Sequence, residues 1–198
     1  MDLKAEIMAD PRNQSFTERG LEPIYMVGKD VRILIIGQAP GLKVEQTGVS
    51  FNDKSGDRLR EWMGIDRDLF YDSGLIGVLP MDFYYPGKAK TGDLPPRKFV
   101  AQEWHQRIMA TMPNIDLILL LGGYSQKYYL DVKSSETLTS IVKRFADFGP
   151  KYFPLAHPSP LNNIWLAKNP WFEATVVPAL QKRVATILAK QVCENIVY

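Results

Sequence analysis

Four short apolar runs are the clearest feature of the hydrophobic pattern along the chain. The first three are rich in β-branched residues and leucine, the fourth begins with two aromatic residues, and each one ends at a glycine, a proline or a polar residue. Runs of this length and composition are typical of strands that are buried on both faces of a sheet. We therefore predict four strands, at residues 31–36, 75–79, 115–121 and 152–156.

Segments with helical spacing lie between and after these runs. In residues 98–112 a large apolar side chain recurs at every fourth position, which is the pattern of an amphipathic helix. Further helical patterns occur at residues 57–63, 125–130, 135–148 and 171–192. Within the last of these, we expect Pro178 to kink or bound the helix, because proline lacks an amide hydrogen.

The alternation of strands and helices predicts an α/β fold. Strands that are apolar at nearly every position occur in parallel sheets that helices cover on both faces. Ligands of such sheets bind beyond the carboxyl ends of the strands. In this chain those ends are followed by residues 37–41, 80–87, 122–125 and 157–162, which are rich in glycine, proline, aromatic and polar residues. We expect these segments to converge and form a binding site.

Composition bounds the possible partners and cofactors. With 198 residues, 45% of them hydrophobic and 23% charged, the chain has the size of one globular domain, residues 1–198, on which residues 1–30 are expected to pack as an N-terminal extension. The net charge of +2 attracts nucleic acid only weakly, so a DNA-binding surface would have to be a local patch. The single cysteine, Cys193, excludes a four-cysteine zinc or iron–sulfur site, and the two histidines have no carboxylates at a recognisable zinc spacing. We expect no metal and no cofactor.

The sequence also lacks the features of a membrane or exported protein. Its first residues are charged, without the apolar segment of a signal peptide, and its apolar runs are far too short to span a bilayer. We expect a cytoplasmic protein with no membrane partner.

Two of the segments that follow strands have informative sequences. The segment HPSPLN at residues 157–162 holds two prolines, which rule out a helix interior and fix His157 and Ser159 in a rigid turn. Chemistry on a ligand needs side chains that are fixed in this way, and a solvated loop histidine is the alternative interpretation. The segment GQAPG at residues 37–41 lacks the residues of a Walker A or dinucleotide-binding loop, and no GxSxG nucleophile elbow occurs. Its glycines allow the backbone to approach a flat or anionic ligand closely.

Together these segments resemble the uracil-DNA glycosylase superfamily. The resemblance rests on GQAPG, on GVSF at residues 48–51 and on HPSPLN, in this order, and it covers residues 31–188. The chain is most similar to the bacterial branch related to the thermostable iron–sulfur enzymes, but it lacks their cluster cysteines. The resemblance implies a three-layer α/β/α fold around a four-stranded parallel sheet. It also implies a monomeric DNA glycosylase, without an iron–sulfur cluster, that hydrolyses the N-glycosidic bond of a flipped-out damaged base, uracil or a related deaminated base.

The resemblance further implies roles for individual residues. His157 would stabilise the negative charge on the leaving base, as a fixed donor does for an oxyanion. Phe51 would stack on the flipped base, with core packing as the alternative. Ser159 and Pro160 would contact the DNA backbone, and Leu161 would enter the space that the flipped base leaves. The remaining base-binding residues would be Gly37, Gln38, Ala39 and Asn52.

The chain departs from the family's pattern where an attacking water would be held. Gln38 and Ala39 stand where members of the family have Asp, Asn or Glu, and neither residue can accept a proton. Asp53 and Asp82 are therefore the candidate catalytic carboxylates. Asp53 has the alternative role of a charge at a helix N-terminus.

A local basic cluster is the candidate for contacts to DNA phosphates. It consists of Arg97 and Lys98 together with Lys88 and Lys90, and a solvated loop is the alternative interpretation. Two other functions are compatible with the sequence. One is a non-catalytic nucleic-acid-binding protein of the same fold, and the other is a hydrolase that acts on free nucleosides.

Overall fold

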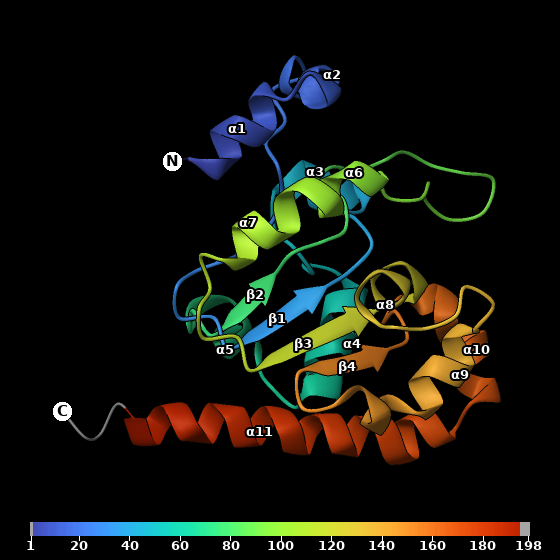
Figure 1. The fold of residues 1–198 in the computed structure, drawn as a ribbon. Coiled ribbons are helices and arrows are strands. Elements are labelled where there is room, and N and C mark those ends of the chain that lie inside the picture. Colours follow the sequence, from blue (N-terminus) through green and yellow to red (C-terminus); the bar gives the residue numbers. More distant parts are fainter. Residues whose placement is uncertain (1, 195–198) are drawn as a thin grey trace.

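A four-stranded parallel sheet forms the centre of the molecule in the computed structural model, which describes residues 2–194 (Figure 1). The strands are β1 (Ile33–Ile36), β2 (Ile76–Val78), β3 (Leu117–Leu121) and β4 (Tyr152–Leu155). They have the spatial order β2-β1-β3-β4, and every pair of neighbours is parallel. The predicted parallel sheet is confirmed, and its strands are one or two residues shorter at their ends than the apolar runs.

Helical segments connect the strands and follow the last one. Between β1 and β2 lie α3 (Leu42–Thr47), α4 (Lys54–Met63) and α5 (Arg67–Asp72). Between β2 and β3 lie α6 (Lys98–Val100), a π-helical turn at Ala101–His105 and α7 (Gln106–Met109). Between β3 and β4 lie α8 (Gly123–Tyr129), α9 (Leu138–Lys143) and a 3₁₀ turn at Phe145–Phe148. After β4 come a 3₁₀ turn at Pro160–Asn162, α10 (Asn163–Lys168), a π-helical turn at Phe172–Val176 and α11 (Val177–Glu194).

The observed helices differ from the predicted ones mainly at their ends. Helix α4 begins three residues earlier than predicted, because its N-cap is Asp53, whose carboxylate accepts a hydrogen bond from the Gly56 amide. Pro178 lies where a π-helical turn passes into α11, a place where its missing amide hydrogen is accommodated. The short helices α3, α5 and α10 were not predicted, because six residues are too few to show a helical period.

Side chains alternate between the two faces of the sheet, and helices cover both faces. Along β1, Ile33 and Ile35 belong to one buried apolar cluster, whereas Leu34 and Ile36 belong to the other. The first cluster includes residues of α4 and α11, and the second includes residues of α1 (Leu3–Ala9) and α7. Figure 1 shows α11 and α7 on opposite sides of the sheet. The fold is therefore a three-layer α/β/α arrangement.

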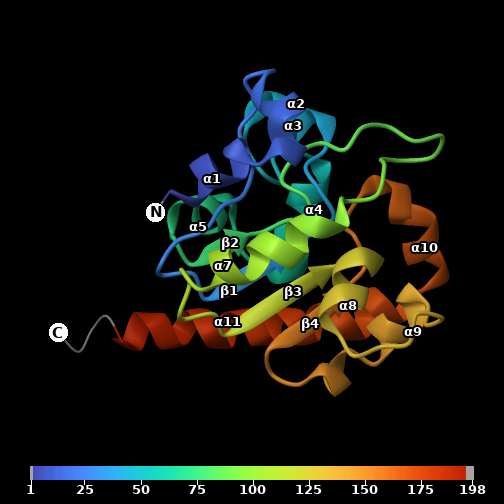
Figure 2. The same ribbon diagram turned by 45° about the horizontal axis from the view of Figure 1, so that its top comes forward.

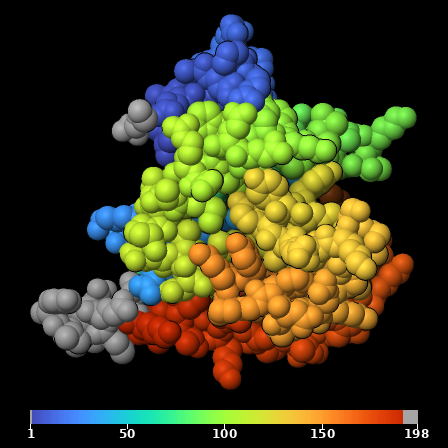
Figure 3. Space-filling model, viewed as in Figure 1, coloured from blue at the N-terminus to red at the C-terminus, as the bar shows by residue number. Residues whose placement is uncertain are grey.

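The N-terminal residues pack against the edge of the sheet. They form α1, a 3₁₀ turn at Pro11–Asn13 and α2 (Gln14–Thr17), and Figure 3 shows them in blue on top of the yellow-green segment. Met26 and Val78 exchange two backbone hydrogen bonds, with N–O distances of 2.8 and 2.6 Å. This bridge covers the outer edge of β2, which would otherwise present unpaired backbone groups.

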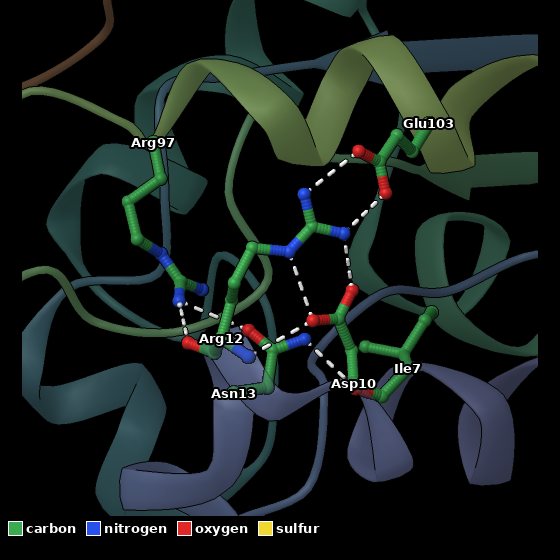
Figure 4. Close-up of polar contacts among 6 residues, drawn as sticks. All are labelled: Ile7, Asp10, Arg12, Asn13, Arg97 and Glu103. Carbon is green, nitrogen blue, oxygen red and sulfur yellow. Dashed lines mark hydrogen bonds and ion pairs between the residues drawn. The ribbon is translucent and has the colours of Figure 1, made fainter.

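Polar contacts fasten this N-terminal segment to the rest of the molecule (Figure 4). The Arg12 guanidinium contacts the carboxylates of both Asp10 and Glu103, the latter in the π-helical turn before α7. Arg97 donates a 2.9 Å hydrogen bond to the side-chain oxygen of Asn13, which is buried. Arg97 thereby joins the N-terminal segment to the chain that follows β2.

Within the described part of the chain, no helix has the length and apolar character needed to cross a bilayer. Residues 2–194 likewise include no cluster of three or more histidine, cysteine or acidic side chains that could hold a metal ion.

A buried histidine links the helical layer to the end of β2. His105 is 1% exposed, and its Nε2 lies 3.0 Å from the Pro80 carbonyl oxygen. Because a carbonyl oxygen can only accept a hydrogen bond, Nε2 must carry the proton and donate it. Its Nδ1 then accepts a hydrogen bond from the Tyr129 hydroxyl. Burial lowers the pKa of His105 from 6.5 to about 4, against the opposing effect of the Pro80 carbonyl. The folded protein therefore holds this imidazole neutral at pH 7.

The low pKa of His105 predicts that the folded state becomes more stable as the pH rises from about 4 to 6.5. In that window the unfolded chain binds a proton at this histidine and the folded chain does not, so acid favours unfolding. The gap between the two pKa values corresponds to a free energy on the order of 3 kcal/mol, present above pH 6.5 and lost as the pH falls toward 4. Urea denaturation at several pH values should show a weaker pH dependence for His105→Gln than for the wild type. An equal dependence in the two proteins would contradict the low pKa.

Candidate functional site

A cavity of about 730 Å³ lies at the carboxyl edge of the sheet. Its walls include residues 37–41 after β1, Pro80 after β2, Tyr124 at the start of α8 and residues of the HPSPLN turn after β4. This volume lies in the usual range of small-molecule sites and can hold a nucleobase. Of the predicted site residues, those that line it are Gly37, Gln38, Ala39, Phe51, Asp53, His157, Ser159 and Leu161. A second, more open hollow of about 480 Å³ beside α1 is lined by none of them.

His157 is held by the turn that its own segment forms. The Ser159 amide donates a hydrogen bond to His157 Nδ1 at 3.2 Å, and the Asn162 side-chain amide donates to the His157 carbonyl at 2.7 Å. Because Nδ1 accepts a hydrogen bond, the proton of the neutral imidazole resides on Nε2. His157, which lines the cavity, therefore carries its N–H donor on Nε2.

The charge of His157 is set by burial and by two carboxylates. Burial lowers the pKa of His157, while the negative charges of Asp53 and Asp93 act in the opposite direction and raise it. Burial is the largest of these effects, so the imidazole is neutral at pH 7. A neutral donor in a partly buried site is suited to stabilising a developing negative charge.

Phe51 belongs both to the cavity wall and to the edge of the apolar core. Its ring packs edge-to-face on Phe70, with ring centroids 6.3 Å apart, and it also lines the cavity next to Gly37. Among the described residues it is the one non-glycine residue with a left-handed backbone, at φ 56°. Its carbonyl accepts a hydrogen bond from the buried Arg60 guanidinium at 3.2 Å, and this contact supports the strained turn.

Asp53 lines the cavity and also caps a helix. One carboxylate oxygen, Oδ1, accepts a 3.0 Å hydrogen bond from the Gly56 amide at the start of α4. The adjacent Asn52 does not line the cavity, and its side-chain oxygen instead accepts a hydrogen bond from Arg67. The predicted contact of Asn52 with a base edge is therefore not supported by its position.

Asp82 and Arg97 do not reach the cavity, because they pair with each other. Asp82 is fully buried, and both of its oxygens bind the Arg97 guanidinium, at 2.7 and 2.8 Å. The backbone amides of Arg97 and Tyr84 also donate to this carboxylate. The position of Asp82 therefore does not support a catalytic role, whereas a DNA contact of Arg97, which is half-buried, stays a prediction.

Gln38 uses its side chain to hold a neighbouring loop. Its amide Nε2 donates a 3.1 Å hydrogen bond to the carbonyl of Leu94. That loop contributes Lys88, Thr91, Gly92 and Asp93 to the cavity wall. Sequence reasoning placed Lys88 in a basic cluster but gave Asp93 no role, because nothing in the local sequence shows that the loop folds back over the strand ends.

Exposed apolar side chains stand at the rim of the cavity. Leu161 is 81% exposed and Ile164, one helical turn further on, is 71% exposed. The Leu161 amide donates to the Ser159 hydroxyl, and the exposed Pro160 lies between them, so this part of the turn is rigid. Lys98 is exposed at the start of α6 and does not line the cavity. Tyr124, which is 49% exposed, lines the cavity from the segment 122–125 that the sequence placed at the site, although no role was predicted for this residue.

Comparison with known proteins gives a family. The family model described as the uracil DNA glycosylase superfamily matches residues 25–181, and the chain belongs to this superfamily. A structural relative is the solution NMR structure of a provisionally assigned uracil DNA glycosylase from Methanosarcina acetivorans. The two chains are 15% identical, the match covers 80% of this chain and 94% of the other, and the TM-score is 0.46.

The close approach of Gly56 to Phe51 predicts that a larger residue at position 56 destabilises the protein. A Cβ atom at Gly56 would lie 1.6 Å from the Phe51 carbonyl oxygen, so Gly56→Ala must displace the turn or the start of α4. We expect it to lower the free energy of unfolding by about 3 kcal/mol or more, as severe overpacking does. The matched control is Gly28→Ala, whose Cβ would meet nothing within 4 Å. Equal urea midpoints for the two variants would contradict this account of the turn.

Proposed function

We propose that the protein is a DNA glycosylase that hydrolyses the N-glycosidic bond of a damaged base, uracil or a related deaminated base, in base-excision repair. The observation that carries the proposal is the neutral imidazole of His157, which lines a cavity of base size and carries its proton on Nε2. Phe51 on the wall of the same cavity offers a ring for stacking. Membership in the uracil DNA glycosylase superfamily supports the same class of reaction.

The proposed reaction uses His157 as a donor to the leaving base. When the C1′–N bond breaks, its electron pair stays on the base, and negative charge develops on a carbonyl oxygen of the base. A fixed N–H donor binds that charge more strongly in the transition state than in the ground state, which accelerates the step. Water then adds its oxygen to C1′ and releases a proton, and the base anion takes up a proton from solvent.

The rim of the cavity supports DNA, rather than a free nucleoside, as the substrate. Leu161 is a large apolar side chain that lines the cavity and faces solvent, and such side chains fill the space left by a flipped base. In this proposal Ser159 and Pro160 contact the DNA backbone, and the exposed Lys98 is a candidate for a phosphate contact. We further propose that the enzyme acts as a cytoplasmic monomer.

A cleavage assay distinguishes this function from its alternatives. Oligonucleotides containing uracil, hypoxanthine or xanthine, in single- and double-stranded form, are incubated with the protein and tested for abasic sites. We expect cleavage of at least one of these oligonucleotides. Binding without cleavage would favour a non-catalytic nucleic-acid-binding protein, and cleavage of nucleosides alone would favour a nucleoside hydrolase.

The role of His157 predicts a defect in chemistry rather than in binding. His157→Ala should lower the single-turnover cleavage rate by about 10²–10³-fold with little change in DNA affinity, because the donor acts on charge that develops in the transition state. His157→Gln keeps an N–H donor, so its single-turnover cleavage rate should lie between the rates of His157→Ala and the wild type. An unchanged single-turnover rate in a folded His157→Ala protein would rule out the proposed role.

A further inference from the structure

The segment that closes one side of the cavity is a small hairpin rather than an open loop. Lys88 and Asp93 form an antiparallel bridge, and the Leu94 amide donates to the Gly87 carbonyl at 2.9 Å. At the tip, the Ala89 amide donates to the carbonyl of Gly92, which has a left-handed backbone at φ 74°. Figures 1 and 2 show this green segment extending past the carboxyl ends of the strands, and Figure 3 shows it standing out from the surface. The hairpin fixes the backbone that carries Asp93.

One side chain of the first-strand loop anchors this hairpin. Gln38 donates from Nε2 to the Leu94 carbonyl at 3.1 Å, directly next to Asp93. An amide cannot accept the proton of an attacking water, so Gln38 is unable to act as a general base itself. Asp93 can accept a proton, and it lines the same cavity as Gln38. The hydrogen bond of Gln38 to Leu94, the next residue in the chain, holds Asp93 there.

Two carboxylates line the cavity, and they differ in how they are engaged. Asp53 uses Oδ1 to cap helix α4. Asp93 is solvent-exposed, and among the described residues its carboxylate accepts only a long hydrogen bond of 3.4 Å, from the Tyr85 hydroxyl. The pKa of Tyr85 is raised by desolvation and by the charge of Asp93, so its hydroxyl stays protonated and can donate. Asp93 thus has the greater freedom to bind a water.

We propose that Asp93 is the carboxylate that orients and deprotonates the attacking water, and that Gln38 is the positioning residue that holds it at the cavity through Leu94. This inference rests on the proposed glycosylase function. The water oxygen bonds to C1′ as the C1′–N bond breaks, and its proton passes to the Asp93 carboxylate. The base keeps the electron pair of the broken bond and is protonated from solvent, while Asp93 returns its proton to solvent.

The test compares two cavity carboxylates with a carboxylate elsewhere. Single-turnover cleavage is measured for Asp93→Asn, for Asp53→Asn and for Asp131→Asn, an exposed control that does not line the cavity. Asn also caps helices well, so Asp53→Asn removes a charge without removing the cap. We expect Asp93→Asn to lower the rate by about 10²-fold or more, the usual contribution of a general base, Asp53→Asn to lower it by much less, and Asp131→Asn to stay near the wild-type rate. A wild-type rate for Asp93→Asn, or a large loss confined to Asp53→Asn, would overturn the proposal.

The role of Gln38 is tested by a double-mutant cycle and by the pKa of His157. If Gln38 acts through Asp93, then Gln38→Ala combined with Asp93→Asn should be no slower than Asp93→Asn alone. Gln38→Ala should also lower the pKa of His157, as Asp93→Asn does, because it lets the Asp93 charge move away from the imidazole. The other charged or titratable groups on this cavity, Lys88, Asp53, Tyr124 and His157, are unchanged in these variants. Additive losses, or an unchanged pKa of His157 in Gln38→Ala, would assign Gln38 a purely structural role.

The pKa of His157, which can be measured without a substrate, helps to separate failure of this inference from failure of the proposed function. Asp93 carries a negative charge that raises the pKa of His157, so Asp93→Asn should lower the pKa of His157 in an NMR titration. If the wild type cleaves a damaged base and Asp93→Asn changes neither the rate nor this pKa, only the present inference fails. If the wild type cleaves none of the substrates, the proposed function fails and the catalytic role of Asp93 fails with it.

Discussion

The Ser159 amide donates a hydrogen bond to Nδ1 of His157, and this contact determines which ring nitrogen carries the proton. With Nδ1 engaged as an acceptor, the neutral ring has one remaining polar hydrogen, on Nε2. Burial keeps the ring neutral by lowering its pKa, so the cavity contains a fixed, uncharged donor. The two prolines of the HPSPLN segment make this geometry durable, because they restrict the backbone that carries both residues.

The other walls of the cavity depend on polar contacts that lie behind them. Arg60 is buried and binds the Phe51 carbonyl, which stabilises a left-handed backbone that a phenylalanine rarely adopts. The fully buried Asp82 and the half-buried Arg97 form an ion pair that shapes the chain after β2. Removing Arg97 would leave the Asp82 charge buried without compensation, which typically costs about 3–5 kcal/mol. The site is therefore supported by charged groups that themselves contact no ligand.

The strands and the place of the site could be predicted because they depend on local sequence. Apolar runs of strand length specify a buried parallel sheet, and parallel strands bring their carboxyl ends to one edge. His157, Phe51 and Gln38 line one cavity for this reason, although they are far apart in the chain. The family resemblance, which rests on the segments at this edge, agrees with the family model that matches residues 25–181.

The parts of the site that could not be predicted from the sequence are those whose positions depend on tertiary contacts. Asp82 follows a strand as a catalytic carboxylate would, and only the return of Arg97 fifteen residues later shows that it is neutralised. Asp93 reaches the cavity because its hairpin closes and because Gln38 holds Leu94, and neither contact has a local sequence signal. Asp53 was left with two possible roles, and its position is compatible with both, since it caps α4 and lines the cavity.

The protonation state of His157 is the most direct test of this account. The chain has two histidines, so a long-range ¹H–¹⁵N NMR spectrum of the ¹⁵N-labelled protein contains two ring patterns, which the His157→Ala variant assigns. At pH 7 we predict that His157 has a protonated Nε2 and an unprotonated Nδ1. A ring protonated on Nδ1 alone, or on both nitrogens, would contradict the claim that the fold holds a neutral Nε2–H donor at the cavity.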